Sequence, residues 1–367
     1  MATVRTPRGV IPIVPLKGRG ATSNRAPRYD AWDRQLDAEY LDSTLADDVP
    51  PAPRTYVTEQ AARSIISRNN SPDVPFDQSV NPFQGCEHGC IYCYARPTHA
   101  YLGLSAGLDF ETKLYAKTNA AELLAKELSK TTYVPSLIAL GANTDPYQPI
   151  ERGLEITRSI LRVLSDFNHP VGITTKSALV ERDIDILQPM AAKGLVRVFV
   201  SITTLDHEVA RRMEPRANAP ARRLQAVRTL AEAAIPVGVL VAPVIPSLTD
   251  QDLEAVLAAS AHAGADSAGY VMLRLPLEIR DLFVEWLEAN YPLRAKHVMS
   301  LVQQIRAGKD NDSTFGQRMR GTGRFADLIA QRFDIACRRL KLNARDLALD
   351  TSLFAVPRSA AGQLPLF

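Results

Sequence analysis

The spacing of apolar and polar residues divides the chain into parts of different character. The first 75 residues are rich in proline, arginine and aspartate and show little periodicity, which favours an irregular N-terminal extension. From residue 76 onward, short β-branched runs alternate with segments that repeat apolar residues at helical spacing. Such alternation is typical of βαβ units and a parallel sheet, so we expect an α/β core that begins near residue 76.

Six strands can be placed in this core, with helices between them. The strands are predicted at 78–84, 137–140, 171–175, 196–202, 237–242 and 269–273. The helices are predicted at 119–130, 154–166, 184–193, 222–234 and 252–263. Six such units predict a partial (β/α)6 TIM-type barrel. A doubly wound open sheet has the same local pattern and is the alternative.

The core barrel is predicted to span residues 76–290, and a helical, basic C-terminal segment is predicted at 291–355. Helical spacing appears at 282–290, 295–307 and 323–340. The basic residues of the C-terminal segment are Arg318, Arg320, Arg324, Arg332, Arg338, Arg339 and Lys341. Residues 356–367 are expected to form a flexible tail.

The composition is that of a globular protein, with 46% hydrophobic and 23% charged residues. Four cysteines, three of them clustered, do not make a disulfide framework, which favours a reducing compartment. No apolar stretch is long enough to span a bilayer. Pro12 and Pro15 interrupt the apolar run near the N-terminus, and no small-residue cleavage site follows. We therefore expect a cytoplasmic protein without a membrane partner.

The net charge of +3 conceals an uneven distribution of charge along the N-terminal extension. Residues 1–29 carry six basic residues and no acid, whereas residues 30–48 carry seven acids against one arginine. A basic arm beside an acidic patch is compatible with contact to nucleic acid. It is equally compatible with a solvated extension.

Three cysteines, Cys86, Cys90 and Cys93, lie in one short segment with the spacing CxxxCxxC. Three thiolates suit an iron–sulfur cluster that keeps one iron free for another ligand. A structural zinc ion would need a fourth ligand, which His88 or His99 could supply. Zinc sites, however, usually show two separated cysteine pairs, and this chain has only one cysteine outside the segment. We favour the iron–sulfur interpretation and keep zinc as the alternative.

The cysteine segment resembles that of the radical S-adenosylmethionine (radical SAM) enzymes, in which an aromatic residue, here Tyr92, precedes the last cysteine. The resemblance covers roughly residues 76–345. Segments 86–94, 141–151 and 214–216 are most similar to relatives of spore photolyase that are labelled DNA repair photolyase-like. The resemblance implies a partial barrel with a [4Fe–4S] cluster whose open iron binds S-adenosylmethionine. It also implies cleavage of S-adenosylmethionine to a 5′-deoxyadenosyl radical, with an electron donor such as a flavodoxin or ferredoxin.

Two polar residues at predicted strand ends are candidates to bind S-adenosylmethionine, because the active site of a barrel lies at the carboxyl ends of its strands. Lys176 follows the third strand and could hold the carboxylate, while Ser201 ends the fourth and could donate a hydrogen bond. Both match family positions that contact the methionine part. The structural alternatives are a solvated lysine at a helix start and a serine that caps a turn.

The resemblance assigns further positions with less specificity. Thr144 and Asp145 take the place of the family's polar turn near the amino group of the methionine, and Tyr92 matches a residue near the adenine. Arg216 could reach the carboxylate or the ribose. Asp145 is also an ordinary turn residue before proline, and Arg216 could instead form a surface ion pair with Glu214.

The chain departs from spore photolyase at one position. In that enzyme a cysteine, three residues before the aspartate of the second-strand turn, returns a hydrogen atom to the product radical, and here Ala142 stands there. Cys337 lies in a predicted helix and is interpreted as a packed core thiol. Tyr92, Tyr94 and Tyr147 are the alternative hydrogen donors, so the same reaction by the same route is not expected.

The last residues of the chain resemble the Gln-Leu-x-Leu-Phe peptide that bacterial replication and repair proteins insert into the sliding clamp. Apolar anchors after a polar glutamine suit a groove on a partner protein, whereas a frayed terminus is the structural alternative. The anchors would be Gln363, Leu364, Leu366 and Phe367.

These features together predict a radical SAM enzyme that acts on nucleic acid, in DNA repair or modification. The first alternative is a radical SAM enzyme with a protein or small-molecule substrate. The second, from a different class, is a zinc-binding scaffold associated with DNA.

Overall fold

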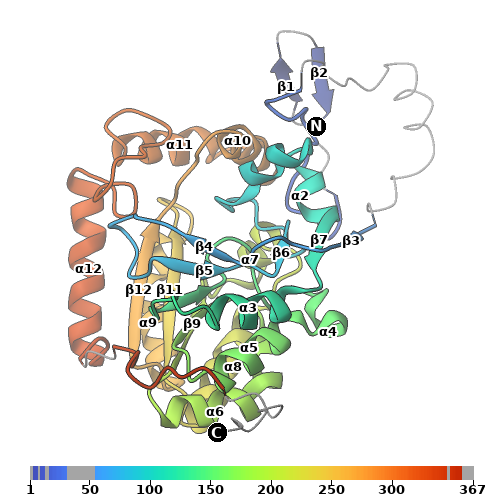
Figure 1. Ribbon diagram of the computed structural model, residues 1–367. Coiled ribbons are helices and arrows are strands. Elements are labelled where there is room, and N and C mark those ends of the chain that lie inside the picture. Colours follow the sequence, from blue (N-terminus) through green and yellow to red (C-terminus); the bar gives the residue numbers. More distant parts are fainter. Residues whose placement is uncertain (1–2, 7–8, 13–15, 31–53, 345–347, 358–367) are drawn as a thin grey trace, which may run out of the picture.

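The computed structural model describes residues 3–6, 9–12, 16–30, 54–344 and 348–357. The strands of its main sheet are β4 (Ile66–Arg68), β5 (Gln78–Val80), β8 (Ile138–Leu140), β9 (Val171–Thr175), β10 (Val196–Ser201), β11 (Val237–Val244) and β12 (Ser267–Met272). They pair in the order β12-β11-β10-β9-β8-β5-β4 (Figure 1). All neighbours from β5 to β12 are parallel, and β4 is antiparallel to β5.

This strand order confirms the predicted barrel-type fold. The six parallel strands are neighbours in the same order in which they follow one another along the chain. A doubly wound sheet instead reverses its strand order at a switch point, which this sheet does not do over its described strands. The strands are mostly buried, as expected of a parallel sheet that is covered by helices.

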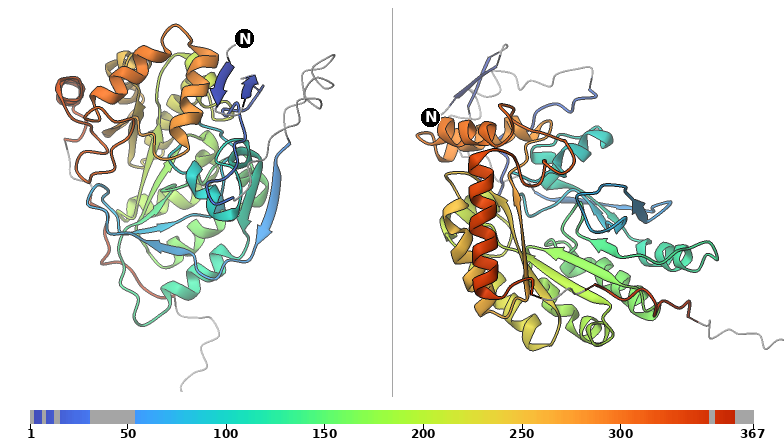
Figure 2. Two further views of the ribbon diagram at one scale, coloured as in Figure 1. Left: turned by 90° about the horizontal axis from the view of Figure 1, so that it is seen from above. Right: turned by 90° about the vertical axis from the view of Figure 1, so that its left-hand side faces the viewer.

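Helices connect the strands and cover one face of the sheet (Figure 2). They are α3 (Ala120–Leu128), α4 (Glu151–Leu154), α5 (Ile156–Asp166), α6 (Ile184–Ala192), α7 (His207–Met213), α8 (Pro220–Glu232) and α9 (Leu253–His262). In α5 the buried residues Ile156, Ile160, Leu161 and Leu164 recur at helical spacing and form one apolar stripe. The predicted helices are therefore confirmed to within a few residues.

The helices after the last strand cover the carboxyl end of the sheet and its β12 edge. They are α10 (Ile279–Asn290), α11 (Ala295–Gln304) and α12 (Arg324–Leu340). Figure 1 shows α10 and α11 above the carboxyl end of the sheet and α12 standing beside β12. The ring of Phe333 in α12 lies 4.7 Å from that of Tyr270 in β12, which fixes the helix against the sheet edge.

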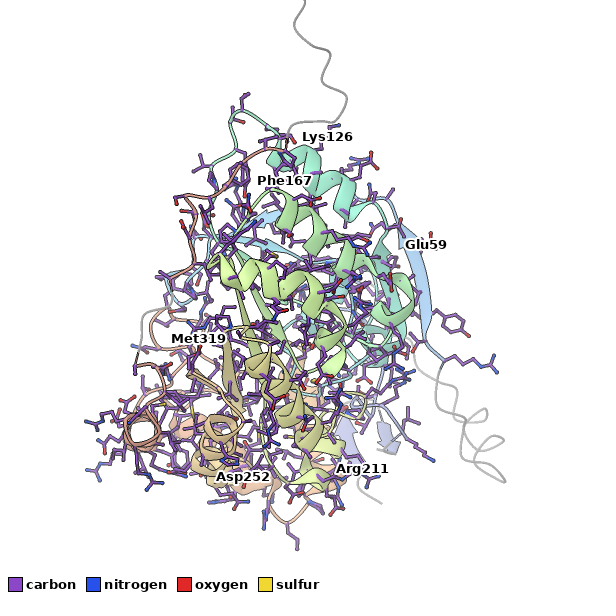
Figure 3. The ribbon with its side chains drawn as sticks, turned by 90° about the horizontal axis from the view of Figure 1, so that it is seen from below. Glu59, Lys126, Phe167, Arg211, Asp252 and Met319 are labelled. Carbon is purple, nitrogen blue, oxygen red and sulfur yellow. The ribbon has the colours of Figure 1, made fainter. Side chains whose placement is uncertain are left out.

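A second, smaller sheet was not predicted from the sequence pattern. It contains β3 (Tyr56–Gln60), β7 (Lys113–Lys117) and β6 (Phe83–Gln84), paired in the order β3-β7-β6. The strand predicted at 78–84 is thus divided between two sheets at Asn81 and Pro82, where proline supplies no N–H for a ladder. Glu59 in β3 and Met319 lie on opposite sides of the molecule in the view from below (Figure 3).

The first 75 residues also contain strands, which differs from the irregular extension expected from the sequence. Besides β3 and β4 there is a short hairpin of β1 (Thr3–Thr6) and β2 (Gly9–Pro12). Strand β3 is exposed over four of its five residues, so it carries no apolar–polar alternation that the sequence could reveal.

Arginines of the N-terminal arm form ion pairs within the chain. Nε of Arg25 donates to Glu285 at 2.7 Å, and Nη1 of Arg28 lies 2.9 Å from Oε1 of Glu278. Both carboxylates belong to α10 or to the residue directly before it. These two ion pairs therefore hold the arm against the barrel, and the barrel carboxylates largely neutralise the charge of both arginines.

Residues 348–357, the C-terminal strap, cross the end of the sheet where the strands begin. The N–H of Asp350 donates to Gly194 O and that of Ala355 to Phe167 O, each at 3.0 Å. The ring of Phe354 lies 5.5 Å from that of His169. Figure 3 looks onto this end of the molecule and labels Phe167. The clamp-like peptide at 363–367 lies outside the described residues.

Two apolar clusters make up most of the core. The larger one lies between the sheet and its helices, and the smaller one joins α10 and α11 to the cysteine segment. In the smaller cluster Ile91 and Tyr92 pack with Phe283 and Trp286. Within the described ranges, no helix combines the length and the apolar character that crossing a membrane would require.

Candidate active site

The three clustered cysteines lie on one loop, residues 85–94, which we call the cysteine loop. It follows β6 and leads into the 3-10 helix η1 (Arg96–Leu102). Cys86 and Cys90 are buried, Cys93 is half-buried, and all three are free thiols. Backbone turns hold the loop, because Gly89 N donates to Cys86 O and Cys93 N to Cys90 O. The loop therefore presents three sulfur atoms within eight residues of chain.

A buried arginine fixes the backbone of the cysteine loop from behind. Arg96 is fully buried, and its guanidinium donates to Cys90 O at 2.8 Å and to Gly89 O at 3.0 Å. It also pairs with Glu111, which is equally buried and which accepts from Gly20 N and Ala21 N. The N-terminal arm thus contributes to the support of the loop.

Burial affects the protonation of the three thiols. Burial raises the pKa of the Cys90 thiol to about 12 and raises the pKa values of Cys86 and Cys93. When a metal centre binds, it displaces the protons of such thiols, which become thiolates. A ligand set made only of thiolates matches an iron–sulfur cluster. Cys337 lies in α12 within the main core, as predicted for a packed thiol.

The histidines that were candidates for a zinc ligand make other contacts. His99 Nε2 lies 2.9 Å from Lys113 O, and His88 Nδ1 lies 3.3 Å from Asp145 Oδ2. In the part of the chain that the structure describes, no three His, Cys, Asp or Glu side chains are grouped so as to hold a single metal ion.

Asp145 connects the cysteine loop to the carboxyl end of β9. Its carboxylate accepts from Thr175 Oγ1 and from Lys176 N, each at 2.7 Å, and its Oδ2 lies 3.3 Å from Nδ1 of His88 on the loop. Burial opposes ionisation of this carboxyl group. His88, the Thr175 hydroxyl and the Lys176 N–H nevertheless lower its pKa to about 2, so the group is a carboxylate at neutral pH.

Lys176 and Ser201, the two strand-end candidates, both lie at the carboxyl end of the sheet near the cysteine loop. Nζ of Lys176 is 5.8 Å from the centre of the Tyr92 ring, and the charge of Lys176 acts on the Cys90 thiol. No ion pair to Lys176 is formed within the described ranges. Ser201 is buried, and its hydroxyl donates to Ala242 O at 3.3 Å. Lys176 is therefore a cation beside the loop without a carboxylate partner.

Beneath Tyr92 lies a buried network that the sequence did not predict. The Tyr92 hydroxyl donates to Glu214, Thr203 Oγ1 donates to the same carboxylate at 2.9 Å, and Arg223 forms an ion pair with it. Although burial opposes ionisation, Arg223 and then Lys176 lower the pKa of Glu214. A pair of Glu214 with Arg216, the alternative drawn from the sequence, is not formed.

The remaining candidates take part in other contacts. Arg216 instead pairs with Glu87 at 2.8 Å, on the cysteine loop itself. Thr144 donates to Phe83 O at 3.0 Å, and the buried Tyr147 hydroxyl donates to Asp183 at 3.0 Å, next to α6.

Tyr94 differs from the other two tyrosines in its exposure. Its side chain is 49% exposed, and its hydroxyl donates to the carbonyl of Ala142. Of the three tyrosines considered as hydrogen donors, it is the one open to a bound molecule.

Sequence reasoning missed Arg96, Glu111, Thr203 and Arg223, although one of them left a signal. Arg223 precedes the buried Ala226, Val227 and Leu230 of α8 by three, four and seven residues, so it lies on the apolar stripe of that helix. A charged residue on such a stripe requires a buried partner. The partner, Glu214, comes from a different element, and the sequence pattern does not identify it.

The site and the fold define a class of protein: an α/β partial barrel with a three-cysteine loop at the carboxyl ends of its strands. Residues 80–259 match the family model of the Radical SAM superfamily. This part of the chain therefore carries a Radical SAM domain.

Comparison with known proteins gives several further likenesses. An uncharacterized protein of Mycobacterium tuberculosis is 37% identical over 225 residues, which make up 61% of this chain and 66% of that relative. The match therefore spans slightly less than two thirds of the mycobacterial protein. An uncharacterized protein of Methanocaldococcus jannaschii is 27% identical over 213 residues, or 58% of this chain and 76% of the relative.

Among solved structures, spore photoproduct lyase in complex with dinucleoside spore photoproduct has a similar fold. The TM-score is 0.55 at 18% sequence identity, and the match covers 77% of this chain and 79% of that one. At this level of identity the likeness concerns the fold, and it confirms the predicted barrel type.

Proposed function

We propose that this protein is an enzyme that binds a [4Fe–4S] cluster through Cys86, Cys90 and Cys93 and cleaves S-adenosylmethionine to modify or repair nucleic acid. The observation that carries the proposal is the cysteine loop itself. Three free thiols lie on one supported loop at the carboxyl end of the strands, beside Lys176, for which the described part of the chain supplies no carboxylate partner. When bound, the reduced cluster supplies the electron that breaks the sulfonium bond of S-adenosylmethionine and yields a 5′-deoxyadenosyl radical.

The residues around the loop would bind and orient S-adenosylmethionine. Lys176 would pair with its carboxylate, since an ammonium without an ion-pair partner suits an anion. Ser201 and Asp145 would bind the amino-acid part, and Tyr92 would pack near the adenine. The Glu214–Arg223 pair would hold Tyr92 in place and keep this side of the site dry.

Several observations support nucleic acid as the substrate. The solved structure with a similar fold contains a dinucleoside photoproduct, which is a nucleic-acid lesion. Exposed arginines on α12, among them Arg324 and Arg338, face solvent without an ion-pair partner in the described residues. The peptide at 363–367 would add a contact to the sliding clamp.

Tyr94 would return a hydrogen atom to the product radical. Its hydroxyl bonds to the carbonyl of Ala142, the position where spore photolyase has a cysteine donor. In this step the O–H bond of Tyr94 breaks homolytically, the hydrogen atom forms a C–H bond on the product, and a tyrosyl radical remains. Tyr92 and Tyr147 are buried and bonded to carboxylates, so they are less suited to this role.

The test is anaerobic reconstitution with iron and sulfide, followed by assays of 5′-deoxyadenosine without nucleic acid, with intact DNA, with ultraviolet-irradiated DNA and with RNA. We expect four irons per chain and more 5′-deoxyadenosine with one of the DNA samples. A protein that takes up zinc but no iron and sulfide would end the enzyme proposal. Cleavage that no DNA or RNA stimulates would instead point to a protein or small-molecule substrate.

A further inference from the structure

Cys93, the last cysteine of the loop, lies between two tyrosines in the sequence, and each tyrosine ring is contacted by a cation. Lys176 lies over Tyr92, and the guanidinium carbon of Arg274 lies 5.8 Å from the centre of the Tyr94 ring. Arg274 follows the end of β12 by two residues, so it comes from the carboxyl end of the sheet, as Lys176 does. The proposed carboxylate of S-adenosylmethionine accounts for Lys176 only. Arg274 is a second cation of the same site with nothing yet assigned to it.

The hydrogen-bonding capacity of Arg274 is largely unused. Among the described residues, its buried Nε has no hydrogen-bond partner, and its Nη1 contacts the sulfur of Met319 at 3.7 Å. Within the ranges that the structure describes, no carboxylate lies within 4.0 Å of it. Asp73, the acid whose charge acts on Arg274, is already bonded to Gly316 N and paired with Arg318.

A third arginine adds to the positive charge from behind. Arg306 is 1% exposed, and it donates to Leu273 O at 2.7 Å and to Arg318 O at 2.9 Å; its partners in the described ranges are backbone carbonyls and include no carboxylate. Burial, and then the charge of Arg274, lower the pKa of Arg306 to about 10. Buried cations without a counter-ion are costly, and an anion bound beside Arg274 would offset part of this cost.

We infer that Arg274, supported by Arg306, binds a backbone phosphate of the nucleic-acid strand that bears the substrate nucleotide. This inference rests on the proposed function and names the contact by which the site would hold its substrate. A guanidinium with free N–H groups matches phosphate oxygens in a forked geometry. Tyr94, half exposed beside it, offers a ring on which a base can stack. A phosphate and a base would thus be bound next to the cysteine loop.

The test measures binding of a fluorescent single-stranded oligonucleotide to the reconstituted protein at several salt concentrations. The variant is Arg274→Gln, and the matched control is Arg162→Gln, which removes one exposed charge on α5, a helix to which no role in binding is assigned. We expect Arg274→Gln to bind roughly tenfold more weakly and to lower the salt slope by about one. Arg162→Gln should change both by much less. A peptide nucleic acid of the same sequence, which lacks phosphates, should not distinguish Arg274→Gln from the unaltered protein.

The outcomes separate this inference from the proposed function. Equal affinities for the unaltered protein and Arg274→Gln, or equal losses in Arg274→Gln and Arg162→Gln, would overturn the phosphate contact while the proposed function stands. Failure of the unaltered protein to bind any oligonucleotide would count against the proposed substrate class and the inference together. Thermal unfolding of each variant shows whether it is folded. If Arg274→Gln does not fold, Arg274→Lys keeps the charge without the fork, and an unchanged affinity in that variant would overturn the forked contact.

Discussion

Glu214 and Arg223 form an ion pair in which each side chain is only 1% exposed, directly beneath the tyrosine that precedes the last cysteine. The neighbouring Arg222 forms an exposed pair with Glu181, so two adjacent residues of α8 provide a buried and a surface ion pair. Arg223→Met should cost about 3–5 kcal/mol of unfolding free energy, because it leaves Glu214 as an unpaired buried charge. Arg222→Met should cost at most about 1 kcal/mol. Urea unfolding of both variants measures the two losses in unfolding free energy. Similar losses would contradict the claim that the buried pair contributes more to stability than the surface pair.

The cluster ligands can be tested against the fourth cysteine of the chain. Cys90→Ala should reduce iron uptake and lower the rate of 5′-deoxyadenosine formation by more than about a hundredfold. Loss of a residue that only supports a metal ligand costs up to about a hundredfold, and loss of the ligand itself should cost more. Cys337→Ala, which changes a thiol of α12, should keep both properties. Iron analysis and the cleavage assay are the measurements. Full cleavage activity in Cys90→Ala would refute the ligand assignment.

Gly89 should be sensitive to a side chain for two reasons. Its φ of 68° is left-handed, and a Cβ there would lie 2.8 Å from Oε2 of Glu111, which supports Arg96. Gly103 has nearly the same φ, 67°, but open space around it. Gly103→Ala should therefore cost about 1 kcal/mol from backbone strain alone. Gly89→Ala should cost more and should also lower the iron bound per chain. Equal stability and iron content in the two variants would show that the contact of the loop with Glu111 and Arg96 affects neither folding nor iron binding.

His169 makes the stability of the protein depend on pH. Burial lowers its pKa from 6.5 to about 4, so between these values the unfolded chain binds a proton that the folded protein does not. The contribution of His169 to the free energy of unfolding is therefore complete above about pH 6.5. It is lost as the pH drops toward 4, which lowers the free energy of unfolding by up to about 3 kcal/mol. His169→Gln keeps a neutral acceptor for Tyr133, 2.7 Å from the ring nitrogen, and should flatten this decline. Melting temperatures between pH 7 and pH 5 test the prediction, and an unchanged decline in the variant would assign it to other groups.

Tyr94→Phe tests the proposed return of a hydrogen atom. The variant keeps the ring beside Arg274 but loses the O–H bond, so 5′-deoxyadenosine should still form while less product accumulates for each molecule of it. Tyr147→Phe is the control, because its hydroxyl is buried against Asp183. The ratio of product to 5′-deoxyadenosine is the measured quantity. A ratio unchanged in Tyr94→Phe would exclude this tyrosine as the donor.

The fold class and the cysteine motif could be predicted from the chain because both depend on local pattern. Strands such as β9 and helices such as α5 bury one face or both, and burial imposes a periodicity that the sequence displays. The CxxxCxxC spacing is equally local. Strand β3 was missed because it is exposed and has no such periodicity, and the strand at 78–84 was not divided because pairing in two sheets is decided by distant segments.

By itself, the sequence determined that this protein is an α/β chain with three thiols on one loop and polar residues where strands end. Only the tertiary structure decided which charges meet. It paired Glu214 with Arg223 rather than Arg216, placed Arg96 behind the cysteines, and left Arg274 without a carboxylate among the described residues. The physical reason is that ion pairs and hydrogen bonds between elements depend on how helices and strands pack. Residues that are far apart in the sequence leave no periodic pattern that records this packing.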